Sequence, residues 1–115
     1  MFYEIYTKRN YQVIKINEVL SLGSDITELD NIVNDLLKKN IVNVAIYFKD
    51  GSYLYSGSAA VIIRCWEYIK EKNGNFVLIN VNEEILDFLA VMGLDSVIKI
   101  CNSDEELEDI DIFYI

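Results

Sequence analysis

The stretch Tyr53-Leu54-Tyr55-Ser56-Gly57-Ser58-Ala59-Ala60-Val61-Ile62-Ile63 passes from a loop of small and hydroxyl-bearing residues directly into an apolar helix. It follows residues 42–48, an almost unbroken run of β-forming apolar residues that is typical of a central strand covered on both faces. Small hydroxyl residues at a helix start lie beside free backbone N–H groups and the positive end of the helix dipole. The segment therefore predicts a strand, a loop and a helix, with a loop suited to capping, to anion binding or to carrying a phosphate.

Upstream of this segment, the pattern predicts a hairpin and a helix. Residues 2–6 and 11–16 are β-forming apolar residues interrupted by single polar side chains, and we interpret both segments as strands. Asp25 and Glu28 have the spacing of a capping box, and they predict the start of a helix whose apolar positions continue to Leu37.

Downstream, strands and helices alternate to the end of the chain. The predicted elements are a helix over residues 58–72, a buried strand over 75–81, a helix over 83–92 capped by Asn82 and ended by Gly93, a strand over 97–100, and an acidic helix opened by Ser103 with Glu106. Helices between successive strands imply largely parallel pairing. We therefore predict an α/β fold in the order ββαβαβαβα, with a mixed, mostly parallel sheet of four to five strands and about four helices in a single domain over residues 1–115.

Composition argues against several classes of function. The net charge of −9 opposes binding to nucleic acid and to anionic membrane surfaces. No apolar run approaches the roughly 18 residues that cross a bilayer. The N-terminus lacks the layout of a signal peptide, so we expect a cytoplasmic protein.

Catalysis and metal binding are also disfavoured. The chain has no histidine, which removes the commonest general base and metal ligand. Cys65 and Cys101 lack Cys-x-x-Cys spacing, and we interpret them as buried free thiols. Gly57 alone makes no dinucleotide or phosphate-loop fingerprint. We expect no enzyme, no metal and no cofactor.

Two interpretations of the loop and helix stay open from the residues alone. Ser56 and Ser58 act either as helix caps or as acceptors of phosphate from an external kinase. Ile63 and Tyr68 lie at the edges of the helix's apolar stripe, where they serve the core or a partner-facing patch. The acidic run at residues 104–111 is interpreted as a solvated helix face, with a docking surface for a basic partner as the alternative.

Two segments resemble the STAS domain family, and within it the stand-alone bacterial anti-sigma factor antagonists. In that family a strand leads into an Asp-Ser-Ser/Thr-Gly-Leu motif and an apolar helix, and the matching residues here are Tyr55-Ser56-Gly57-Ser58-Ala59. The second match is residues 85–97, which is similar to the family's helix that ends in a Gly-Leu pair before the last strand. The resemblance covers residues 13–106 and implies a STAS-like sandwich.

The resemblance implies a function in partner switching. In such a pathway the antagonist binds an anti-sigma factor, which frees the sigma factor and so regulates transcription. Antagonists of this type bind an anti-sigma factor that is also a serine kinase, and phosphorylation of the motif's second hydroxyl residue breaks the complex. In an ungapped alignment, Gly57 stands at that acceptor position and Tyr55 at the position of the Asp. Either Ser56 or Ser58 is therefore a displaced acceptor, or the chain binds its partner without a switch.

The resulting prediction is a non-enzymatic protein-interaction module that binds an anti-sigma factor or serine-kinase-type regulator. The predicted contact residues are Tyr53, Tyr55, Ser56, Gly57, Ser58, Ala59, Ile63 and Tyr68. The alternatives are a STAS-like domain that binds a small molecule or anion, and a structural subunit of a signalling assembly. A homodimer is left open.

Overall fold

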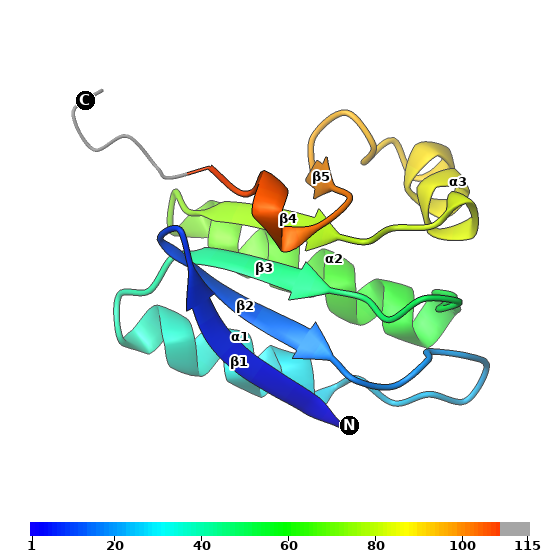
Figure 1. The fold of residues 1–115 in the computed structure, drawn as a ribbon, viewed down its shortest axis with the longest axis horizontal. Helices are drawn as coiled ribbons and strands as arrows, with labels where there is room; N and C mark the ends of the chain where they lie inside the picture. The colour runs from blue at the N-terminus through cyan, green and yellow to red at the C-terminus, as the bar shows by residue number, and fades with distance from the viewer. Residues whose placement is uncertain (109–115) are drawn as a thin grey trace.

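A five-stranded mixed sheet forms the centre of the molecule in the computed structural model, which describes residues 1–108 (Figure 1). The strands are β1 (Tyr3–Lys8), β2 (Tyr11–Ile16), β3 (Asn43–Tyr47), β4 (Asn75–Ile79) and β5 (Lys99–Cys101), and they lie in that order across the sheet. β1 pairs antiparallel with β2, and every other neighbouring pair is parallel. The predicted α/β class and the mostly parallel sheet are confirmed.

The antiparallel edge is the predicted hairpin. Lys8 lies opposite Tyr11, so only Arg9 and Asn10 form the turn. Both turn residues have positive φ angles, 48° and 68°. That is the conformation that two-residue hairpin turns need in order to match the twist of their strands.

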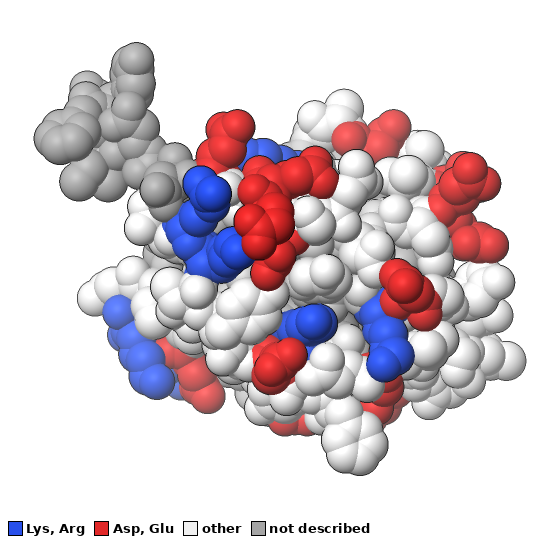
Figure 2. Space-filling view, viewed as in Figure 1, with Lys and Arg blue, Asp and Glu red and all other residues white. Residues whose placement is uncertain are grey.

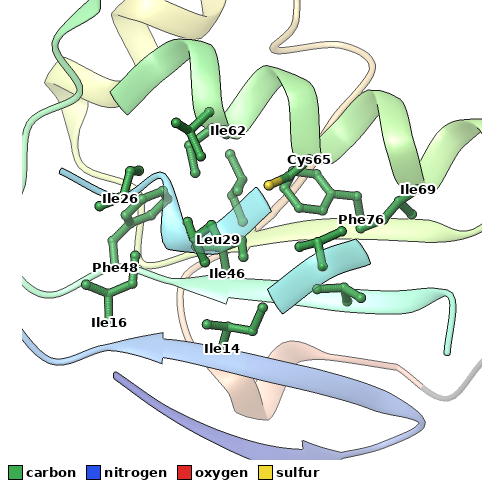
Figure 3. Packing of buried hydrophobic residues seen from close by; sticks show 14 of the residues in the cluster. Ile14, Ile16, Ile26, Leu29, Ile46, Phe48, Ile62, Cys65, Ile69 and Phe76 are labelled. Carbon is green, nitrogen blue, oxygen red and sulfur yellow. The ribbon is translucent and has the colours of Figure 1, made fainter. Parts of the chain in front are cut away.

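Within residues 1–108, three α-helices accompany the sheet: α1 (Glu28–Lys38), α2 (Ser56–Glu71) and α3 (Glu83–Val91). α1 and α2 lie side by side on one face, behind the sheet in Figure 1. A salt bridge of 2.8 Å between Arg64 and Asp30 joins these two helices. Apolar side chains of α2, among them Ile62, Cys65 and Ile69, pack with strand residues in the main core (Figure 3).

The opposite face of the sheet is covered by residues 102–107, called here the C-terminal strap. The strap contains the 3-10 turn η1 (Asp104–Glu106) and ends at Leu107, which is 1% exposed. Tyr6 Oη donates a hydrogen bond of 2.7 Å to Asp104, and Lys8 Nζ lies 2.8 Å from Glu105 Oε1. Figure 2 shows acidic and basic side chains adjacent on this face. β3 is thus covered on both faces, as its apolar sequence predicts.

Three helix predictions need correction. α1 begins at Glu28, because Asp25 accepts hydrogen bonds from the backbone N and the hydroxyl of Thr27 and so closes a local turn. α2 begins two residues earlier than predicted, at Ser56.

The predicted final helix is a single 3-10 turn within the described residues, so the described chain has three α-helices rather than four. The predicted capping box is nonetheless present in this turn, where Glu106 accepts from the backbone N of Ser103 at 3.1 Å. Residues 109–111 of the predicted acidic run lie outside the described residues.

Candidate functional site

The loop over residues 48–55 follows β3 and is held between the loops that follow β2 and β4. Ser52 Oγ, in a residue with no exposed surface, accepts a hydrogen bond of 3.1 Å from the backbone N of Leu20. Tyr53 N donates to the Leu20 carbonyl at 2.8 Å. On the other side, the Asn82 amide donates to the Ser52 carbonyl. These contacts fix the loop at the carboxyl end of the parallel strands, where α/β proteins commonly place their functional groups.

Exposed aromatic side chains lie on this fixed loop. Tyr53 is 42% exposed and Tyr55 44%, and their ring centroids are 6.3 Å apart. The neighbouring loop adds Val19 and Leu22, which are also exposed. Tyrosine rings held by a rigid backbone are frequent anchors of protein interfaces, since they bury a large area at little entropic cost.

The start of α2 lies next to the tyrosine pair, and no side chain in the described part of the molecule caps it. Its N-cap residue is Tyr55, and its first turn contains no acidic residue. Ser56 and Gly57 are exposed, and the first intrahelical bond runs from Ala59 N to the Tyr55 carbonyl. The three N–H groups before Ala59 therefore have no helical partner, which leaves a positive helix end that favours a negative group.

Ser58 and Ala59, by contrast, do not belong to the exposed surface. Ser58 is 5% exposed, with its hydroxyl 3.4 Å from the Ser24 carbonyl, and Ala59 is 2% exposed. Ser58 lies on the inward stripe of α2, at helical spacing from Ile62, and the helix start packs against the loop over residues 17–27. The expectation that Ala59 forms part of an exposed helix edge is wrong, and Ser56 alone of the two predicted acceptors lies at the surface.

The structure also separates the remaining predicted contact residues. Ile63 is half-buried in the second turn of α2. Tyr68 lies twelve residues beyond Ser56, about 18 Å along the helix axis, and it packs against the main core. Val19 and Leu22 were not predicted as contact residues. The signal in the sequence was a group of apolar residues in this loop, Val19, Leu20 and Leu22, which does not reveal that the loop lies beside Tyr53.

The cysteines and acidic side chains of the described residues do not gather into a metal site. Within residues 1–108, no cluster of three or more potential metal ligands is present. Both cysteines are free and buried, and burial raises the pKa of the Cys65 thiol to about 12, so the thiol stays protonated. Of the helices in this part of the chain, none has the length and apolar character needed to span a membrane.

Comparison with known proteins gives the family to which this chain belongs. The family model of the STAS domain matches residues 3–107, so the chain belongs to the STAS domain family. A search of curated proteins finds no match.

Solved structures share the fold. A crystal structure of a candidate anti-sigma factor antagonist from Thermotoga maritima has a TM-score of 0.73 at 20% identity, covering 90% of this chain and 89% of that chain. An NMR structure of the same Thermotoga protein also gives 0.73 at 20% identity, over 92% of this chain and 85% of that chain. An anti-sigma factor antagonist (STAS) domain protein from Planctomyces limnophilus gives 0.63 at 20% identity, over 90% and 92%.

Proposed function

We propose that this chain is a non-catalytic partner-binding module of the anti-sigma factor antagonist type, whose contact surface is Tyr53, Tyr55, Ser56 and Gly57 with the adjoining Val19 and Leu22. The observation that carries the proposal is the exposed tyrosine pair on a loop fixed by Ser52, directly beside an uncapped helix start. The solved structures with this fold that are described as anti-sigma factor antagonists support an anti-sigma factor as the class of partner. The resemblance to the STAS family further implies that this partner is a serine kinase.

Ser56 is the proposed phosphate acceptor, and a phosphate there would end the interaction. Its side chain is exposed at the first position of α2. Phosphorylation would add roughly two negative charges that the helix dipole stabilises within this chain. The same charges would have to be desolvated in a packed interface, which opposes binding of the partner.

Gly57→Asp tests the contact surface without disturbing the fold. A Cβ at Gly57 meets no atom within 4 Å, and a carboxylate in the first helical turn complements the dipole. We expect an unchanged or higher melting temperature and at least tenfold weaker binding to purified anti-sigma factor kinases of the native organism, measured by biolayer interferometry. Gly57→Ala is the matched control and should retain most of the affinity. Equal affinity of the folded Asp variant would contradict the assigned surface.

Phosphorylation is tested by incubating the wild-type chain and a Ser56→Ala variant with the bound kinase and ATP, followed by peptide mass spectrometry of residues 50–64. Phosphate on Ser56, absent from the variant and accompanied by dissociation of the complex, supports the switch. An unmodified peptide in a complex that still forms would mean that the chain binds without being switched.

A further inference from the structure

A groove of about 490 Å³ lies where β4 begins, between the last turns of α2 and the edge of the sheet. β5 pairs with β4 only from Val77 onward, so the first two residues of β4 extend beyond the start of β5. The groove wraps around this free end. It is at the amino ends of the parallel strands, whereas the tyrosine loop follows the carboxyl end of β3.

The walls of the groove are largely apolar and aromatic. Trp66 comes from α2, Phe76 from β4, Tyr11 from the start of β2, and Val97 from the segment before β5. Trp66 is half-buried and Val97 is 56% exposed, so apolar surface remains accessible to a ligand. The volume lies within the roughly 300–1,000 Å³ of small-molecule sites.

The charged side chains that line the groove are both lysines, Lys70 and Lys99. Lys70 Nζ lies 4.8 Å from the centroid of the Trp66 ring, and neither lysine forms a salt bridge within the described part of the chain. Among residues 1–108, this groove is lined by two lysines without a salt-bridge partner and by no carboxylate, which is unexpected in a protein with a net charge of −9. Its charge is complementary to an anion, and its walls are complementary to an apolar chain.

We propose that this groove binds a small organic anion with an extended apolar body, of the class of medium-chain carboxylates. The carboxylate would lie between Lys70 and Lys99, with its chain against the accessible surfaces of Trp66 and Val97. Glu67 and Glu71 border an adjacent depression that shares Trp66 and Lys70, so their charges would oppose binding from the outer side of α2. The proposed site is separate from the partner-binding loop and does not depend on it.

Trp66 is the only tryptophan of the chain, so its fluorescence reports directly on the groove. We would titrate the full chain with decanoate below its micelle concentration, and in parallel with decanol and decyltrimethylammonium. The expected result is a saturable change with decanoate, half-complete at or below about 1 mM, and at least tenfold weaker responses to the neutral and cationic analogues. A non-saturable decanoate response, or equal binding of the three probes, would overturn the proposal.

Variants that remove charges test whether Lys70 and Lys99 bind the carboxylate of the ligand. Lys70→Gln combined with Lys99→Gln should weaken decanoate binding about five- to tenfold, whereas Glu67→Gln with Glu71→Gln should strengthen it. Lys49→Gln is a control with the same chemical change at an exposed position after β3. Gly57→Asp should leave decanoate binding unchanged, which keeps this test independent of the partner-binding surface. If the lysine pair variant behaved like Lys49→Gln, the groove would not be an anion site.

Discussion

At the residue scale, two glycines differ in the space around the position that a Cβ atom would occupy. Gly57, in the first turn of α2, faces open space. Gly74 lies at the start of β4, where an added Cβ would overlap the Val42 carbonyl oxygen and lie 2.8 Å from Ile69 Cγ2. The first glycine borders open space, whereas the second allows the end of α2 to approach the sheet closely.

The same substitution at both sites should therefore change stability in opposite directions. Gly57→Ala is expected to raise the free energy of unfolding by up to about 1 kcal/mol, because alanine favours the helix. Gly74→Ala is expected to lower it by more than about 2 kcal/mol, because backbone atoms must move. Urea unfolding followed by circular dichroism measures both. Equal effects at the two positions would show that the close contact at Gly74 relaxes freely.

At the scale of elements, a capping signature predicted the correct start of an α-helix where the side chain bonds within the first turn of that helix. Asn82 was predicted to cap a helix, and its side chain accepts from Ile85 N at 3.0 Å. Asp25 has an equally good capping signature, but its carboxylate bonds with Thr27 two residues on. Both arrangements are local and favourable for an aspartate or asparagine. The loop over residues 17–27 packs against the start of α2, which lies far away in the sequence. No pattern near Asp25 could therefore show whether its side chain would cap a helix or close a local turn.

The C-terminal strap is the element whose role was least visible in the sequence. Its acidic residues resemble a solvated helix, yet the strap crosses the sheet and buries Leu107 among Val13, Ala45 and Val77. The Asp104 carboxylate also accepts from Tyr6, and desolvation together with this hydrogen bond raises the pKa of that phenol. A short charged segment thus covers an apolar sheet face through one buried side chain and polar contacts to β1.

Truncating the Leu107 side chain should show how strongly the stability of the fold depends on the C-terminal strap. Leu107→Ala is expected to destabilise the fold by about 2–5 kcal/mol, the usual range for a fully buried leucine. Leu22→Ala is the matched control, since Leu22 is 77% exposed and its truncation should change stability by less than about 0.5 kcal/mol. Thermal and urea unfolding measure both variants. A Leu107→Ala protein as stable as the control would mean that the strap contributes little to the fold.

At the scale of the whole molecule, the sequence predicted the sheet more fully than the surface. The apolar residues of β2 and the apolar run in β3 follow from burial on both faces of the sheet, and such patterns are local in sequence. The surface depends on which loops meet. Ser58 and Ser56 are equivalent in local sequence, yet the loop after β2 covers Ser58 and leaves Ser56 exposed. The tyrosine loop was therefore predictable as a segment, but its neighbours Val19 and Leu22 were not.

Ser52 connects the fold to the proposed function across the carboxyl end of the sheet, since it bonds to segments that follow both β2 and β4. Ser52→Ala would leave the buried N–H of Leu20 without this acceptor, at a cost of about 1–3 kcal/mol. Because Tyr53 is the next residue, the loop should also lose its fixed position, and partner affinity should fall together with stability. Ser56→Ala, the same change at an exposed position, should leave stability within about 0.5 kcal/mol of wild type.

Unfolding and binding measured on both serine variants would show whether loop support is required for recognition. If Ser52→Ala lowered stability and left affinity intact, the tyrosine pair would act independently of the network beneath it. If both properties fell together while Ser56→Ala remained stable, the contact surface would depend on the junction of three loops. Partner recognition would then depend on the order of strands in the sheet, because this order brings the three loops together.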